Sequence, residues 1–134
     1  MGDSWADKRV LVVDDDEDIL TAIQAAVSDH GATVTQARDG NQAVELAGTV
    51  DPDAVVLDMM LPKRSGFLVL EQLKKGKPRN AGPFVVMITG NLGRRHQSYA
   101  DALGADAYLN KPFRMERLIE ELSKALGPTD EDAE

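Results

Sequence analysis

Short apolar runs and amphipathic stretches alternate along the chain, and this alternation predicts five strands, each followed by a helix. The run at 54–57 has no polar residue at every second position, which is typical of a strand buried on both faces of a parallel sheet. The expected strands lie at about 9–14, 32–37, 54–58, 83–89 and 107–110. The expected helices lie at about 17–29, 40–48, 66–75, 94–103 and 115–126.

The last helix shows the amphipathic pattern clearly, with Leu118, Ile119, Leu122 and Leu126 on one face. A regular strand–helix alternation predicts an α/β fold in which helices cover both faces of a parallel sheet through right-handed crossovers. We therefore expect a doubly wound (βα)5 three-layer sandwich.

The two ends of the chain lie outside this pattern. Residues 1–8 are expected to form an N-terminal extension, 9–126 the folded domain and 127–134 a flexible acidic tail. Trp5 is interpreted as a loose or locally packed aromatic. His30, just before a glycine that ends the first helix, is interpreted as a solvated residue.

Composition limits the class of protein. The chain has 134 residues, enough for one domain with a real core, and 43% of them are hydrophobic. No apolar run approaches 18 residues and the N-terminus lacks a secretory core, so a soluble chain without a membrane span is expected. No cysteine is present, which is compatible with the cytoplasm. The net charge of −8 argues against broad binding to nucleic acid or anionic membranes.

Polar side chains follow the expected strands at the points where they end. Asp58 closes the third strand, and Pro62 and Gly66 then break the pattern, so Asp58 should face a loop at the carboxyl edge of the sheet. Open α/β sheets place their ligand sites at this edge. A lone aspartate could equally cap a helix or sit in a turn, so its companions decide its role.

Five consecutive acids, residues 14–18, follow the first strand. Clustered carboxylates raise each other's pKa unless a cation compensates them, and Mg²⁺ prefers such oxygen ligands. We assign Asp14 and Asp15 to metal binding. Asp16, Glu17 and Asp18 are interpreted as the acidic start of a helix, where the helix dipole favours negative charge.

Thr89 ends the fourth strand, and Lys111 follows the fifth. Taken singly, they could be an ordinary strand residue and a solvated surface lysine. Together with Asp58 they match phosphoryl transfer to a carboxylate, in which a metal, a cation and hydrogen-bond donors neutralise the phosphoryl charge.

With these residues the sequence resembles the receiver domain of two-component response regulators (the CheY-like superfamily) over residues 8–126. The resemblance implies the flavodoxin-like strand order 2-1-3-4-5 and a cis peptide bond before Pro112. It also assigns roles to positions of this chain: the metal-binding acid pair Asp14 and Asp15, the phosphoacceptor Asp58, a metal-binding backbone carbonyl at Met60, the switch pair Thr89 and Tyr108, and the invariant Lys111.

The function implied by the resemblance is a phosphorylation switch rather than an enzyme acting on other substrates. A sensor histidine kinase or a histidine phosphotransfer protein would donate the phosphoryl group to Asp58, with Mg²⁺, or Mn²⁺ in its place, as cofactor. Thr89 and Tyr108 would then alter the face formed by the fourth helix, fifth strand and fifth helix. That face would act on a downstream protein or on an output domain, with no direct nucleic-acid or membrane contact.

Two alternative functions compete with this one. A small Mg²⁺-dependent phosphohydrolase that uses an aspartyl phosphate needs a second acid near the nucleophile, commonly two residues along, where this chain has Met60. A phosphate-independent pseudo-receiver would not need the full set of acids, hydroxyl and lysine. The loop after Thr89, which contains Gly90, Asn91 and Gly93, is expected to be pliable.

Overall fold

The computed structural model describes residues 4–77, 82–90 and 94–129 of the chain. Five strands and five helices alternate within these residues, as the sequence predicts. The strands are β1 (Arg9–Val13), β2 (Thr33–Ala37), β3 (Ala54–Asp58), β4 (Phe84–Gly90) and β5 (Ala107–Lys111). The helices are α1 (Glu17–Ser28), α2 (Gly40–Val50), α3 (Gly66–Lys74), α4 (Arg94–Leu103) and α5 (Met115–Leu126).

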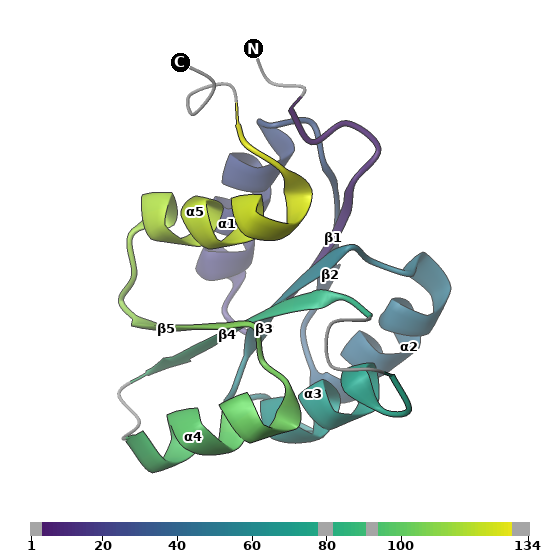
Figure 1. The fold of residues 1–134 in the computed structure, drawn as a ribbon, viewed down its shortest axis with the longest axis vertical. Helices are drawn as coiled ribbons and strands as arrows, with labels where there is room; N and C mark the ends of the chain where they lie inside the picture. Colours follow the sequence, from purple (N-terminus) through teal and green to yellow (C-terminus); the bar gives the residue numbers. More distant parts are fainter. Residues whose placement is uncertain (1–3, 78–81, 91–93, 130–134) are drawn as a thin grey trace.

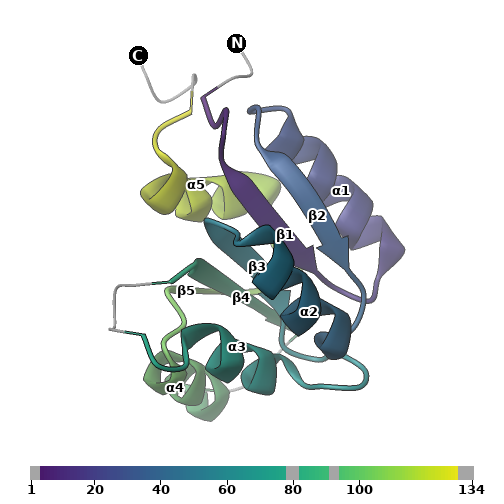
Figure 2. The same cartoon turned by 90° about the vertical axis from the view of Figure 1, so that its right-hand side faces the viewer.

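The strands form one parallel sheet in the order β2-β1-β3-β4-β5. Helices α1 and α5 cover one face, and α2, α3 and α4 cover the other (Figures 1 and 2). This arrangement confirms the expected doubly wound α/β sandwich and its strand order.

The core is divided by the sheet into two layers. Side chains alternate along each strand, so Val10 and Val12 of β1 pack on the side of α1 and α5, whereas Leu11 and Val13 pack on the side of α2 and α3. Every residue of β3 is buried. The central strand that carries Asp58 is therefore held rigidly from both faces.

Helix α2 runs two residues further than the predicted end at 48 and stops at Asp51, which adopts a left-handed conformation with φ of 54°. A residue in this conformation commonly ends a helix. Gly48, at the predicted end, lies inside the helix instead. The peptide bond between Lys111 and Pro112 is cis, as the resemblance implied.

The segment before β1 is packed against the domain, so Trp5, interpreted as either loose or locally packed, is packed. The Trp5 side chain is fully buried, and its backbone N–H donates to the His30 carbonyl at 2.8 Å. The Trp5 and His30 rings lie 4.9 Å apart between centroids, and His30 is itself buried. The interpretation of His30 as solvated was wrong because the N-terminal segment folds back over the end of α1.

The chain that follows α5 meets the N-terminal segment at the same end of the molecule (Figure 1). Thr129 is buried there, so this residue of the expected flexible tail is packed, although Pro128 is exposed. The remaining tail residues, 130–134, lie outside the described part of the chain. No helix in the described ranges is both long and apolar enough to cross a membrane.

Candidate functional site

The carboxyl ends of the strands bring the predicted site residues to one edge of the sheet. Asp14 follows β1, Asp58 ends β3, and Lys111 ends β5. Thr89 lies in β4, one residue beyond the partner of Asp58 in the β3–β4 register, Ile88. Residues far apart in sequence therefore meet because parallel strands end on the same side.

Asp14, Asp15 and Asp58 form a compact carboxylate cluster. One oxygen from each lies within 4.8 Å of the others. Asp14 and Asp58 are only 1% and 3% exposed, whereas Asp15 is exposed to solvent. Three convergent carboxylates with one side open to water suit a hard divalent cation, which takes oxygen ligands and keeps some of its waters. The residues present thus fit Mg²⁺.

Lys111 connects the two buried acids. Its Nζ atom lies 3.0 Å from Asp14 Oδ2 and 3.3 Å from Asp58 Oδ2. The other oxygens of these carboxylates accept backbone N–H groups, from Asp16 to Asp14 at 2.9 Å and from Met60 to Asp58 at 3.1 Å. Each buried carboxylate therefore has two donors, which holds both side chains in one orientation.

Charge and burial shift the pKa values of two groups in the site, Asp58 and Lys111. Burial raises the pKa of Asp58, and the neighbouring charge of Asp14 raises it further, against the opposing effects of the Met60 N–H and Lys111. Burial alone would lower the pKa of Lys111, but the hydrogen bond to Asp14 and the charges of both acids raise it. Lys111 is therefore cationic. Its positive charge and the Met60 N–H do not fully offset the effect of burial and of Asp14 on the Asp58 carboxylate.

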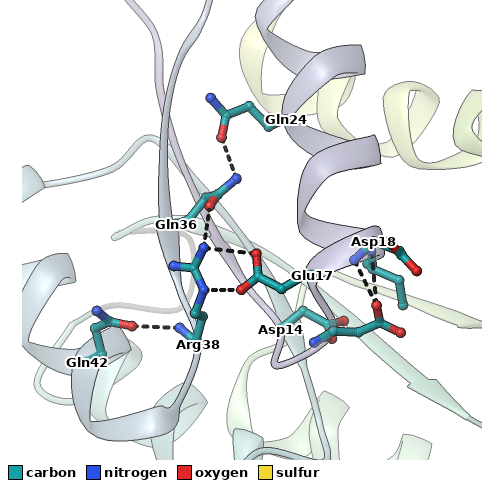
Figure 3. A network of polar contacts seen from close by, with 9 residues as sticks. Asp14, Glu17, Asp18, Gln24, Gln36, Arg38 and Gln42 are labelled. Atoms are coloured by element: carbon teal, nitrogen blue, oxygen red, sulfur yellow. Dashed lines mark hydrogen bonds and ion pairs between the residues drawn. The ribbon is translucent and has the colours of Figure 1, made fainter.

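The five consecutive acids, residues 14–18, divide into two groups. Asp14 and Asp15 belong to the carboxylate cluster, whereas residues 16–18 form the start of α1. Asp16 caps α1, its carboxylate accepting the N–H of Asp18 at 2.9 Å. Glu17 turns to the guanidinium of Arg38, which lowers the pKa of Glu17 (Figure 3). A set of glutamines continues this polar network along α1, β2 and α2: Gln24, Gln36 and Gln42. The pairing of Glu17 with Arg38 was not predicted, since their sequence separation gives no signal.

The two expected switch residues differ in burial, because Thr89 has no exposed surface whereas the Tyr108 side chain is only partly buried. Thr89 is fully buried, and its hydroxyl donates to Met59 Sδ at 3.7 Å rather than to a carboxylate. The Tyr108 hydroxyl is also buried and has no hydrogen-bond partner among the described residues. Burial raises the pKa of Tyr108. The nearby Thr89 hydroxyl opposes this rise, but the two hydroxyl groups are not positioned to form a hydrogen bond.

Met60 lies at the rim of the cluster, with a side chain that is 66% exposed. Asn91, on the loop after β4, lies outside the described residues. Sequence reasoning missed Gly40, which begins α2 and contacts the loop that follows Asp58. A glycine at the first position of a helix, where better helix formers are usual, was the available signal.

The sequence matches one protein family and several curated proteins of that family. The family described as "Response regulator receiver domain" matches residues 10–123. The chain is 37% identical over 127 residues to "Response regulator MprA" of Mycolicibacterium vanbaalenii, covering 92% of this chain and 52% of that protein. It is 40% identical over 106 residues to "Alkaline phosphatase synthesis transcriptional regulatory protein PhoP" of Bacillus subtilis, covering 79% and 43%. The chain thus spans about half the length of these curated relatives.

Solved structures give the same result. The receiver domain of the Francisella response regulator 1452 superposes with a TM-score of 0.80 at 30% identity, covering 90% of this chain and 97% of that one. The chemotaxis response regulator CheY4 of Vibrio cholerae superposes with a TM-score of 0.80 at 27% identity, covering 89% and 98%.

Proposed function

The chain belongs to the response regulator receiver domains of two-component systems, and on that premise we propose that Asp58 is the residue that accepts the phosphoryl group. The observation that carries the assignment is the set of contacts around the Asp58 carboxylate. It is nearly buried at a strand end, within 4.8 Å of two further carboxylates, and 3.3 Å from the Lys111 ammonium.

Asp58 and Lys111 are already oriented for the transfer reaction, whereas the Thr89 hydroxyl must first turn away from Met59. An Asp58 oxygen attacks the phosphorus of a phosphohistidine, the P–O bond forms as the P–N bond breaks, and the imidazole leaves. Lys111 neutralises a phosphoryl oxygen, and the Thr89 hydroxyl donates to another. Asp14, Asp15, Asp58 and the Met60 carbonyl would hold Mg²⁺, which supplies the positive charge that phosphoryl transfer requires.

Thr89 and Tyr108 form the proposed switch. To reach a phosphoryl group, the Thr89 hydroxyl must leave Met59 Sδ, to which it donates in this structure. The Thr89 hydroxyl lies near the Tyr108 hydroxyl, which has no hydrogen-bond partner among the described residues, so the two side chains are expected to move together. Their movement would alter the face formed by α4, β5 and α5, a two-state response to a local change of charge.

Further features of the system belong to the same proposal. The phosphoryl donor is a sensor histidine kinase or a histidine phosphotransfer protein, and the receiver acts in the cytoplasm. Its output passes to a protein target or to an output domain, and it catalyses only its own phosphorylation and dephosphorylation. The phosphohydrolase alternative is disfavoured, because the position two residues after Asp58 is occupied by Met60, which cannot protonate a leaving group.

Incubation with Mg²⁺ and acetyl phosphate, followed by intact-mass analysis, tests the proposal. We expect one phosphoryl adduct on the wild-type chain and none on Asp58→Asn. Asp16→Asn is the matched control, because asparagine caps a helix as well as aspartate does, and it should be labelled normally. Labelling of Asp58→Asn would overturn the assignment, and rapid turnover of p-nitrophenyl phosphate would favour the hydrolase.

A further inference from the structure

The loop between β3 and α3 (residues 59–65, the β3–α3 loop) rests on the beginning of α2. The Gly40 N–H donates to the Pro62 carbonyl at 3.2 Å. Beside it, the Arg64 Nε donates to the Asn41 side-chain oxygen at 3.0 Å. Three successive residues of this loop, 62–64, thus face the first turn of α2, with Lys63 lying 3.7 Å from the Asp39 carboxylate.

The backbone of this loop is strained at Lys63. Lys63 has a φ of 69°, a region that non-glycine residues rarely adopt, and the Arg64 N–H donates back to the Pro62 carbonyl at 2.7 Å. Tight three-residue turns with positive φ are strained and persist only when the surroundings hold them. The Pro62 carbonyl accepts from both Arg64 and Gly40, so the support from α2 acts directly on the strained turn.

The approach of α2 to the loop is too close for any side chain at position 40. A Cβ atom on Gly40 would lie 2.1 Å from the Arg64 carbonyl oxygen and 2.5 Å from the Arg64 Cβ. The nearest atom belongs to the backbone, so the loop itself would have to move. Gly48, in the same helix, has nothing within 4 Å of the corresponding position.

The supported loop begins at the reacting group. Met59 and Met60 directly follow Asp58, and the Met60 N–H donates to the Asp58 carboxylate at 3.1 Å. At its other end the loop is tied back by the Gly66 N–H, which donates to the Met59 carbonyl at 2.9 Å. A shift of the turn at Lys63 is therefore transmitted over a few residues to the backbone beside the Asp58 carboxylate.

We propose that Gly40 is a positioning residue for phosphoryl transfer, since its lack of a side chain lets α2 hold the β3–α3 loop against Asp58. This inference rests on the proposed phosphoacceptor role of Asp58. Gly40 touches neither the phosphoryl group nor the metal and acts through Pro62 and Arg64. Group-transfer rates fall steeply when reacting groups are misplaced, by about a hundredfold for an error of about 1 Å.

Gly40→Ala and Gly48→Ala form a matched pair, because each adds one methyl group to α2. Both should be compared with the wild type at a temperature where all three are folded. We expect Gly48→Ala to be labelled by acetyl phosphate at the wild-type rate, and Gly40→Ala to be labelled about ten to a hundred times more slowly, with weaker Mg²⁺ affinity. Wild-type rate and Mg²⁺ affinity in folded Gly40→Ala would overturn the proposal.

Mg²⁺ affinity separates positioning from a loss of stability alone. A variant that is merely less stable melts at a lower temperature but binds Mg²⁺ normally while folded. Amide hydrogen exchange without metal gives a readout that needs no phosphorylation: the Met60 and Arg64 amides should lose protection in Gly40→Ala and keep it in Gly48→Ala. Unchanged protection in Gly40→Ala would count against the coupling.

Two controls keep the test decisive. If the wild type is never labelled, the proposed function fails, whereas the exchange result still reports on the contact between α2 and the loop. If Gly40→Ala does not fold, Asn41→Ala replaces it, because this change removes the bond to Arg64 without a clash. Slower labelling and faster exchange at Arg64 would support the proposal, and wild-type behaviour in both would overturn it.

Discussion

The indole Nε1 of Trp5 donates a hydrogen bond of 2.8 Å to the carbonyl oxygen of Gly127, 122 residues further along the chain. Both residues lie outside the stretch 10–123 that matches the receiver family. The Trp5 side chain is fully buried and belongs to the core cluster formed with α1 and α5. The folded unit of this protein therefore extends past the matched stretch at both ends.

Trp5→Ala should destabilise the domain by about 3–5 kcal/mol, the usual effect of removing a buried tryptophan. Trp5→Phe keeps much of the apolar volume and loses the bond to Gly127, so a smaller loss is expected. Urea unfolding followed by far-ultraviolet circular dichroism measures both changes. A loss within about 1 kcal/mol for Trp5→Ala would show that the segment contributes little.

Asp58→Asn should stabilise the metal-free protein at neutral pH. Folding raises the pKa of Asp58, so the folded protein holds this proton more tightly than the unfolded chain does. Ionisation therefore lowers stability as the pH rises from the ordinary value of 3.8 through the raised pKa of the folded state. A gain in stability at pH 7 is therefore expected when the Asp58 charge is removed.

Thermal melts in EDTA check this gain. It should be present at pH 7 and vanish at about pH 3, where Asp58 is protonated in both states. An equal difference between wild type and Asp58→Asn at both pH values would mean that its charge is not the cause.

Asp15→Ala should weaken Mg²⁺ binding by about tenfold or more, equivalent to about 1.4 kcal/mol, without unfolding the domain. Asp15 is the exposed member of the carboxylate cluster, and its removal relieves repulsion when no metal is bound. The metal-free melting temperature should therefore be unchanged or higher. Asp18→Ala, outside the cluster, is the control for calorimetric titration, and equal Mg²⁺ affinity in the two variants would refute the assignment.

Tyr108→Phe should leave stability unchanged or raise it by up to about 1 kcal/mol, because it removes a buried hydroxyl that has no partner among the described residues. Tyr99→Phe, at a side chain that is 53% exposed, should have no measurable effect. Chemical unfolding of the unphosphorylated protein distinguishes the two. A clear loss of stability in Tyr108→Phe would reveal a hydrogen bond to its hydroxyl.

Met60→Asn should accelerate loss of the phosphoryl group. Hydrolysis needs a water in line with the phosphorus, and the long, apolar Met60 side chain at the rim offers that water no useful hydrogen bond. An amide at this position could orient the water. Decay of the phosphorylated form in Mg²⁺ buffer measures the rate, with Met60→Leu as the apolar control. If the phosphoryl group is lost no faster from Met60→Asn than from Met60→Leu, the Met60 side chain does not slow hydrolysis in this way.

Much of the fold and the core of the site followed from local patterns. The apolar run before Asp58 predicted a fully buried strand, and β3 is buried throughout. Asp14 and Lys111 could be assigned to the site because both stand at strand ends, and parallel strands end on one edge whatever the details of packing. Asp16 was recognisable as a helix start because capping depends on the nearest few residues.

Other features depend on which distant segments meet, and no local periodicity encodes that. Trp5 and His30 are buried because the N-terminal segment crosses the end of α1, although neither belongs to a regular element. Glu17 separates from Asp14 because Arg38, the residue that follows β2, lies beside Glu17. The contact of Gly40 with the β3–α3 loop likewise arises only when β1, β2 and β3 pack side by side. The sequence by itself determined the elements and the chemistry at their ends, and tertiary packing decided which side chains support that chemistry.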